Sequence, residues 1–212
     1  VLHRSTAEVQ RWFFSRGLRA IVMGSCHEGI PFPSLDIHFR AVCRHAAGVS
    51  LSMGHRRIAL MIAQSGWVGD VASEQGFLEG FQAARHPDAV PLIVHHDRTM
   101  KWIRSALTNL FRSKLHPSGL LVSHPEHVLT VMSHLMSAGI RLPKDISIIS
   151  RDDESFLAHV TPSIARYRFN RNVYASRLSR MVVQLARTGV LSPRQTRVMA
   201  QLQKGDTLAA RA

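Results

Sequence analysis

The sequence predicts an α/β protein built on parallel sheets, and two observations support that prediction. Segments with the apolar pattern of a strand alternate with segments of helical period almost from end to end of the chain, which is typical of βαβ units. The stretch from Gly139 to Asp153 then combines a helix-ending glycine, a proline, a β-branched strand and an acidic strand end. Open parallel sheets bind ligands at the carboxyl ends of their strands, so this order favours a protein with a ligand cleft.

Length and composition indicate a globular chain. It has 212 residues, of which 45% are hydrophobic, enough to bury the core of one large domain or two small ones. No run of about 18 apolar residues is present, and the first residues lack the pattern of a secretory signal. We therefore expect a cytoplasmic protein with no membrane partner. Cys26 and Cys43 are far apart and are expected to be unpaired thiols.

The net charge of +13 raises the possibility of direct nucleic-acid binding, because Lys and Arg neutralise phosphates. The basic residues are, however, scattered along the chain, with only four lysines among 27 basic residues and no stripe of interleaved aromatics. This distribution favours an arginine-rich solvated surface over a DNA-contacting face.

The elements expected in the first part of the chain follow from caps, glycines and apolar spacing. Ser5 or Thr6 caps a first helix, which ends at Gly17. The segments after it are a strand from Leu18 to Met23, a loop to Pro33, a helix that is capped by Ser34 or Asp36 and ends at Gly54, a strand from Arg57 to Ile62, and a helix that starts at Ser73. Three residues of the first helix, Val9, Trp12 and Phe13, are expected on one face.

The remainder of the chain repeats this alternation. The expected strands are Pro91 to His95, Gly119 to Ser123, Ile146 to Ile149, Ile164 to Phe169 and Thr196 to Leu202. The expected helices are Thr99 to Lys114, Pro125 to Ala138 and Asn170 to Thr188. The inward residues expected in the second of these helices are Leu129, Met132, Leu135 and Met136. Gly189 is expected to end the last helix.

Four segments, in this order, resemble a known family. They are Gly54 to Leu60, Gly76 to Phe81, Gly139 to Asp153, and Thr161 to Ile164. Together they are similar to the effector-binding core of LacI/GalR-type bacterial transcription regulators, which share the periplasmic-binding-protein type I fold. The resemblance implies two Rossmann-like subdomains joined by three crossovers, a small effector in the cleft between them, and a homodimer with an N-terminal helix-turn-helix that binds DNA.

By motif position, residues 1–55 and 165–189 would form the N-terminal subdomain, and residues 56–164 and 190–212 the C-terminal one. A family core begins with a strand, a helix and a strand before the first helix expected here. The resemblance therefore implies that the N-terminal part of the first subdomain, and the helix-turn-helix, are missing from these residues.

Three residues are candidates for ligand contact at matching positions of the family. The carboxylates of Asp36 and Asp152 would hold ligand hydroxyls, and Ser25 lies where the first-strand loop would enter the cleft. Each has an alternative role: Asp36 as a helix cap, Asp152 as a solvated or salt-bridged carboxylate, and Ser25 as a turn residue.

Two departures from the family bear on the ligand. Ser73 stands where many sugar- or purine-responsive members have an arginine, and a serine cannot make a bidentate contact. His124 and Pro125 replace a frequent Asn-Asp pair. Trp67 would stack on a ligand ring or pack under its own loop. The effector is thus expected to be a small molecule such as a sugar, of unassigned identity.

Other site chemistries are less well supported. His124 and His127 have the i, i+3 spacing of a shared metal site, with His134 on the same helix, but chance near-spacings are expected among 13 histidines, and we predict no metal and no cofactor. Neither a nucleophile elbow, nor a glycine-rich phosphate loop, nor a His-Glu-x-x-His motif is present, so no catalytic residue is predicted.

The sequence therefore predicts the effector-sensing and dimerisation core of a DNA-binding transcription regulator. The alternative is a solute-binding protein of a transport system with the same fold. A third possibility is a sensor that has lost its ligand and serves as a dimer scaffold.

Overall fold

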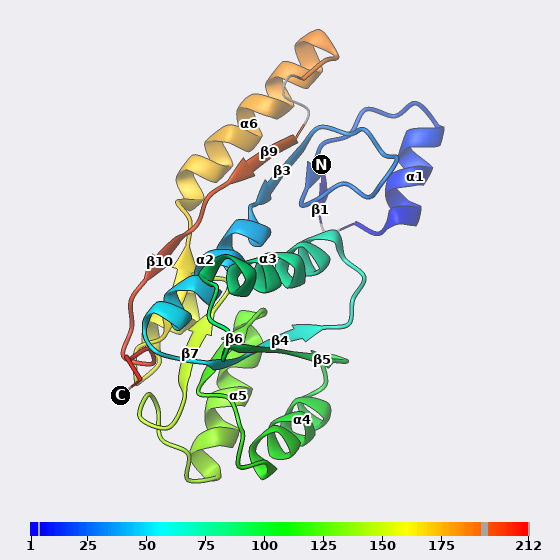
Figure 1. Cartoon of the computed structure of the whole chain (residues 1–212). Coiled ribbons are helices and arrows are strands. Elements are labelled where there is room, and N and C mark those ends of the chain that lie inside the picture. Colours follow the sequence, from blue (N-terminus) through cyan, green and yellow to red (C-terminus); the bar gives the residue numbers. More distant parts are fainter. Residues whose placement is uncertain (4, 192–194, 212) are drawn as a thin grey trace. The chain divides into compact units, whose positions relative to one another are not determined.

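The computed structural model describes residues 1–3, 5–191 and 195–211, and the chain divides into two compact units (Figure 1). Unit 1 comprises Val1–His38, Trp67–Gly69 and Phe169–Ala200. Unit 2 comprises Phe39–Gly66, Asp70–Arg168 and Gln201–Ala212. Each unit is therefore assembled from segments that are far apart in the sequence.

Unit 1 is built on a parallel sheet with the order β1-β2-β3-β9. Its strands are β1 (Leu2–His3), β2 (Val22–Met23), β3 (Ser34–Ile37) and β9 (Gln195–Val198). A small hydrophobic core in this unit contains Ala20, Val22, Ile30 and Phe32.

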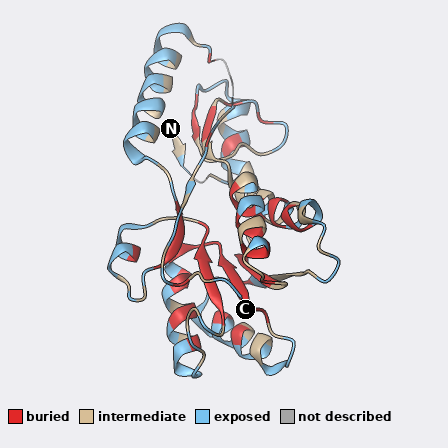
Figure 2. Ribbon diagram, turned by 60° about the vertical axis from the view of Figure 1, so that its left-hand side comes forward, coloured by how far each residue is buried: buried red, intermediate tan, exposed pale blue. Residues whose placement is uncertain are grey.

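The two helices of unit 1 differ in how much of their surface they bury. Helix α1 (Ala7–Ser15) is capped by Thr6, whose hydroxyl accepts from the Val9 amide, and it ends before Gly17, as expected. Helix α6 (Arg171–Thr188) is capped by Asn170, ends at left-handed Gly189 and has no buried residue among those described. Figure 2 shows α6 almost entirely as exposed surface.

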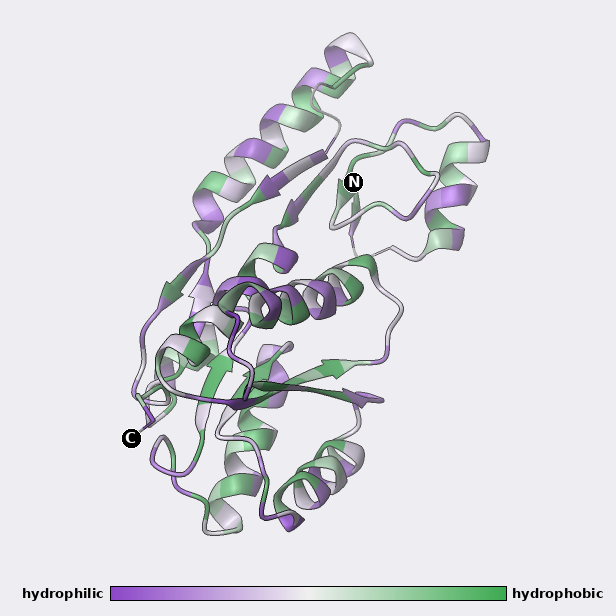
Figure 3. Cartoon of the chain, in the orientation of Figure 1, coloured by the Kyte–Doolittle hydropathy of each residue, from purple (hydrophilic) through white to green (hydrophobic). Residues whose placement is uncertain are grey.

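Unit 2 is built on a six-stranded sheet with the order β10-β8-β7-β6-β4-β5, parallel except for β10. Its strands are β4 (Arg57–Ala63), β5 (Val90–His96), β6 (Gly119–Val122), β7 (Ser147–Ser150), β8 (Ala165–Arg168) and β10 (Gln201–Gln203). The central strands are apolar in Figure 3, as expected of parallel strands that are covered on both faces. The predicted α/β class with parallel sheets is confirmed.

Helices cover both faces of this sheet, with α2 and α3 on one side and α4 and α5 on the other (Figure 1). They are α2 (Phe39–Ser52), α3 (Val68–Ala84), α4 (Met100–Arg112) and α5 (Pro125–Ser137), followed by a short 3-10 turn, Ser155–His159. Helices α2 and α3 approach closely at two glycines: a Cβ on Gly76 would lie 2.0 Å from the Arg40 carbonyl oxygen, and one on Gly80 2.6 Å from the Ala47 Cβ.

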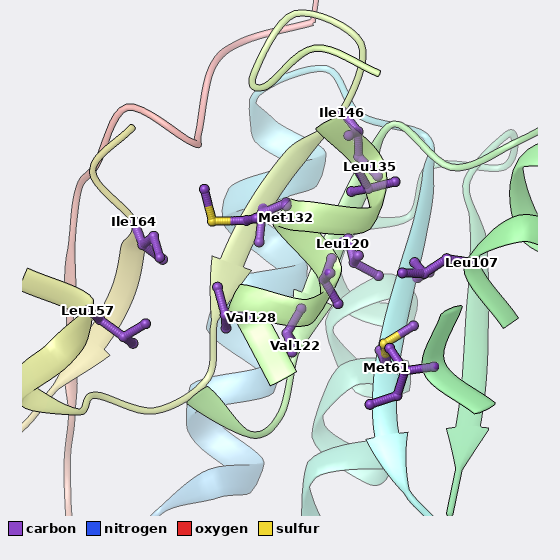
Figure 4. Packing of buried hydrophobic residues seen from close by; sticks show 14 residues of the cluster. Met61, Leu107, Leu120, Val122, Val128, Met132, Leu135, Ile146, Leu157 and Ile164 are labelled. Atoms are coloured by element: carbon purple, nitrogen blue, oxygen red, sulfur yellow. The ribbon is translucent and has the colours of Figure 1, made fainter. Parts of the chain in front are cut away.

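The main core lies between the sheet and the helices α4 and α5 (Figure 4). Met61 from β4, Leu120 and Val122 from β6, and Leu107 from α4 are at most 2% exposed. Truncating any such side chain to alanine typically costs about 2–5 kcal/mol. The core therefore fixes the strands whose carboxyl ends form the candidate site below.

The local prediction was wrong for two helix starts. Ser34 and Asp36 do not cap a helix, because they lie in strand β3, which pairs on both sides with β2 and β9. Helix α3 begins at Val68, so Ser73 lies inside it rather than at its start. In both places tertiary packing overrides a local polar signal.

Several other predictions were wrong in detail. The strand expected from Leu18 to Met23 is confined to Val22–Met23. The strand expected from Thr196 to Leu202 is two strands, β9 and β10, which belong to different sheets. Two side chains expected inside, Leu129 and Met136, are at least 40% exposed.

Within the described residues, no helix is both long enough and apolar enough to cross a membrane.

Candidate ligand-binding site

The candidate site of unit 2 lies at the carboxyl edge of its sheet. Strands β4, β5, β6 and β7 are mutually parallel, so their carboxyl ends meet at one edge, where open α/β sheets hold ligands. The residues that end or follow these strands there are Ser65, His96, Ser123, His124 and Arg151.

A buried ion pair dominates this edge. The Arg151 guanidinium donates from Nη1 to Asp70 Oδ1 at 2.8 Å and to Ser73 Oγ at 2.9 Å. The side chains of Arg151 and Asp70 are only 4% and 5% exposed. The Arg151 Cζ atom also lies 4.2 Å from the centre of the Phe39 ring, a cation–π distance. Arg151 thus ties the end of β7 to helices α3 and α2.

Asp70 remains ionised in this setting. Burial alone would raise its pKa, but the nearby His124 ring, the Arg151 guanidinium and the Ser65 hydroxyl outweigh burial, so the pKa of Asp70 lies well below its usual range. The Ser65 hydroxyl donates to Asp70 Oδ2 at 2.5 Å. A stable buried anion and a stable buried cation therefore lie side by side at the strand ends.

Ser73 is fully buried and accepts the hydrogen bond from Arg151. We noted from the sequence that a serine cannot make a bidentate contact here. In the structure the guanidinium of Arg151, which directly follows strand β7, lies beside Ser73. The predicted ligand contact of Ser73 itself stays a prediction.

The two acidic residues after Arg151 have different surroundings. Half-buried Asp152 accepts the Asp153 amide at 3.1 Å. Asp153 accepts from Arg166 Nε at 2.7 Å and from Arg168 Nε at 2.9 Å. Asp153 therefore has a structural role in unit 2, and the predicted ligand contact stays with Asp152.

In unit 1, Ser25 and Asp36 are brought together. The Ser25 hydroxyl donates to Asp36 Oδ2, and the Ile37 amide donates to Asp36 Oδ1 at 2.8 Å. Tyr174 donates to the Leu35 carbonyl at 2.8 Å, and burial, with the Asp36 carboxylate, raises the pKa of Tyr174 to about 12. The two candidates predicted in this unit thus form one polar pair at the carboxyl ends of β2 and β3.

The loop that carries Ser25 is held by a residue that the sequence did not indicate. Gln10 of α1 is fully buried; its amide nitrogen donates to the Ser25 carbonyl at 3.3 Å, and its amide oxygen accepts from the His27 amide at 3.0 Å. A polar residue on a short helix is ordinarily exposed, so only the fold shows that Gln10 holds this loop.

Gln10→Ala is expected to destabilise unit 1 by about 1–3 kcal/mol, because it leaves buried backbone groups of the Ser25 loop unpaired. The measurement is urea unfolding followed by Trp12 fluorescence in a W67F/W102F background. Arg11→Ala, at an exposed position of the same helix, should change little. Equal effects of the two changes on the free energy of unfolding would contradict the proposed role of Gln10 in stabilising the Ser25 loop.

Trp67 is half-buried and directly precedes α3. Its predicted stacking on a ligand ring stays a prediction.

The three histidines considered as metal ligands do not converge. His124 and His127 are buried neighbours, whereas His134 lies near Thr108 Oγ1, at 3.2 Å. Across residues 1–3, 5–191 and 195–211, no three His, Cys, Asp or Glu side chains are arranged to hold a metal ion.

A model of the periplasmic binding protein-like domain family matches residues 49–208, about three quarters of the chain. The chain belongs to this family. Its fold is that of the effector-binding cores of LacI-type transcription regulators, which confirms the predicted resemblance.

Two curated relatives share limited identity with this periplasmic binding protein-like domain. The probable HTH-type transcriptional repressor ExuR of Bacillus subtilis is 24% identical over 54% of this chain and 34% of its own length. The HTH-type transcriptional regulator CelR of Thermobifida fusca is 23% identical over 66% of this chain and 41% of its own. The matches thus span about a third to two fifths of these relatives.

Solved structures match more completely. A LacI-type regulator from Bacillus cereus subsp. cytotoxis superimposes with a TM-score of 0.88 at 18% identity, over 100% of this chain and 76% of its own. A LacI-family regulator from Enterococcus faecium with bound ribose superimposes with a TM-score of 0.84 at 16% identity, over 98% and 77% of the two chains. At such identities these structures establish the fold alone.

Proposed function

We propose that this domain is the effector-sensing core of a transcription regulator, and that a small polar ligand binds at the carboxyl ends of its parallel strands. The observation that carries the proposal is the concentration of polar and charged side chains at this edge in a family whose matched curated relatives are HTH-type regulators. These relatives favour gene regulation over the alternative of solute transport.

The residues that we propose for ligand contact are Ser25 and Asp36 in unit 1, and Trp67, Ser73 and Asp152 at or near α3 and β7. The family resemblance implies that they line a cleft between two subdomains with boundaries at residues 1–55 with 165–189, and 56–164 with 190–212. Ligand closure of that cleft would shift the population of two subdomain arrangements.

We further propose that the regulator acts in the cytoplasm as a homodimer and contacts DNA through a helix-turn-helix outside these 212 residues. On this proposal the basic residues that give the net charge of +13 form a solvated surface and do not contact DNA. In a symmetric homodimer, ligand binding would change the distance between the two helix-turn-helix domains that bind DNA.

The test of ligand sensing is a thermal-unfolding screen of the chain against neutral sugars, sugar acids, nucleosides and amino acids. A ligand present at about 100 times its Kd stabilises the folded state by ~2.7 kcal/mol, which corresponds to a rise in Tm of roughly 5–11 °C for a chain of 150–250 residues. No shift with any compound class would contradict the proposal.

With a compound that scores in that screen, Asp36→Asn and Asp152→Asn are each expected to weaken binding about tenfold or more, because each removes a charge-assisted hydrogen bond. Isothermal titration calorimetry measures the change. Asp88→Asn is the matched control, since Asp88 is exposed and pairs only with surface Arg56 among the interactions described. Unchanged affinity in both site variants would contradict ligand contact by Asp36 and Asp152.

A further inference from the structure

Five buried side-chain atoms at the carboxyl edge of unit 2 have no hydrogen-bond partner within the part of the chain that the structure describes. They are His96 Nε2, Ser123 Oγ, His124 Nε2, His127 Nδ1 and Arg151 Nε. Every one of these side chains belongs to a residue that is at most 7% exposed. Buried polar atoms without a partner are rare because each costs free energy, so a group of them on one edge indicates a missing partner.

The five atoms belong to one continuous cluster. The His127 ring centre lies 4.6 Å from that of His96 and 5.4 Å from that of His124. His124 Nε2 lies 3.7 Å from Asp70 Oδ2, beyond hydrogen-bond distance. Asp70 in turn binds Arg151, and Ser123 precedes His124 in the chain. One small group bound at this edge would therefore have several of these atoms within reach.

The unsatisfied atoms require an acceptor. His96 Nδ1 accepts from the Arg98 amide at 3.0 Å, so a neutral His96 carries its hydrogen on Nε2, which is a donor. Arg151 Nε always carries a hydrogen. The Ser123 hydroxyl and the remaining imidazole nitrogens of His124 and His127 can donate or accept. No member of the cluster is restricted to accepting, so the complementary partner is rich in oxygen acceptors.

The charged groups that face the cluster are two acidic and two basic side chains. From α3, Asp70 is already neutralised by Arg151; from α5, Glu126 Oε1 lies 3.9 Å from His124 Nδ1, on a side chain that is 62% exposed. Arg98 follows β5. Burial, then the neighbouring His127 and His124 rings and Arg98, lower the pKa of His96 to about 4.

Burial is also the main cause that lowers the pKa of His127. The His96 and His127 rings are therefore neutral near pH 7, and charging either of them lacks a sufficient counter-ion. A bound anion would supply that counter-ion and raise their proton affinity.

We propose that the histidine cluster, with Arg151 and Ser123, binds an acidic group of the effector, a carboxylate or a phosphate, and that an imidazole takes up a proton from water when this group binds. This inference rests on the proposed ligand-sensing function and narrows its ligand to acidic small molecules. A neutral sugar would leave the imidazoles uncharged and would gain less binding free energy from its contacts with the cluster.

The test compares acidic compounds with their neutral parents by isothermal titration calorimetry at pH 6, 7 and 8. The pairs are D-glucuronate with D-glucose and D-galacturonate with D-galactose, with glucose 6-phosphate and inorganic phosphate as phosphate probes. An acidic compound is expected to bind at least tenfold more tightly than its neutral parent. Its affinity should fall with rising pH by up to about tenfold per pH unit, the limit for one proton taken up. Uronate binding identifies a carboxylate, and glucose 6-phosphate binding a phosphate.

Proton uptake gives an independent readout, because the binding enthalpy then depends on the ionisation enthalpy of the buffer. His96→Gln and His127→Gln keep a polar side chain that cannot be protonated, and each should reduce both the pH dependence and the buffer dependence. His95→Gln on β5 and His134→Gln on α5 are matched controls at non-buried positions and should leave both unchanged. Circular dichroism verifies that each variant is folded.

The outcomes separate this inference from the proposed function. Tight, pH-independent binding of a neutral sugar would overturn the inference and support the proposed function. Binding of inorganic phosphate without any of the organic acids would mean an adventitious ion only, and would also overturn it. If neither acidic nor neutral compounds of any class bind, the proposed function itself fails.

Discussion

Arg151→Ala is expected to destabilise unit 2 by about 3–5 kcal/mol, because it leaves the Asp70 carboxylate buried without its cation. The two side chains are 4% and 5% exposed, so water cannot replace the lost guanidinium. Unfolding in guanidinium chloride, followed by Trp102 fluorescence in a W12F/W67F background, measures the change, since Trp102 is then the only tryptophan and lies in unit 2.

Two further variants test the cause. Arg151→Met combined with Asp70→Asn removes both charges and should recover much of the loss, since apolar replacement of a whole buried pair is often close to neutral. Arg56→Ala removes a surface ion pair to Asp88 and should cost at most about 1 kcal/mol. If Arg151→Ala were no more costly than Arg56→Ala, the buried pair would not organise the strand ends as we describe.

Gly76→Ala is expected to destabilise unit 2 by about 3 kcal/mol or more, at the upper end of the cost of overpacking. The new Cβ would lie 2.0 Å from the carbonyl oxygen and 2.7 Å from the carbonyl carbon of Arg40, so α2 and α3 would have to separate. This cost exceeds the roughly 1 kcal/mol that alanine gains over glycine in a helix. The same fluorescence-detected unfolding measures it.

Gly48→Ala is the matched control, because Gly48 lies in α2 and a Cβ there meets no atom within 4 Å. This substitution should stabilise the chain by about 0.5–1 kcal/mol. A stabilising Gly76→Ala would contradict the close approach of the two helices. Because α3 carries Asp70 and Ser73, the Gly76 contact also matters for the geometry of the candidate site.

The strands and helices of unit 2 were largely predictable, because their signals are local. The β-branched and apolar runs at Arg57–Ala63 and Val90–His96 are strands, and the helix expected from Thr99 to Lys114 is α4, Met100–Arg112, which Thr99 caps. Strand β3 was not predictable in this way. Its Ser34 and Asp36 suggest a helix cap, but its pairing with β9 joins residues about 160 positions apart, which no local pattern encodes.

The candidate site, too, was predictable only where its signals are local in the sequence. The position of Asp152 near the carboxyl end of β7 was predictable, because polar residues that follow a buried strand lie at a known position of parallel sheets; its ligand contact stays a prediction. The partnership of Arg151 with Asp70 was not, because it joins residues 81 positions apart and depends on how β7 and α3 pack. An arginine directly after a buried strand was the available signal. His96, at the end of β5, was overlooked because its partners are brought together only by the sheet order.

The most direct test of the central claim, that the carboxyl strand ends form a ligand site, is hydrogen–deuterium exchange with and without a compound that raises the Tm. We predict slower exchange on ligand addition in the segments around residues 24–38, 63–73, 96–102, 122–128 and 150–154, with little change in β10. Protection confined to other segments, or a ligand-induced rise in Tm without protection at these strand ends, would contradict the claim.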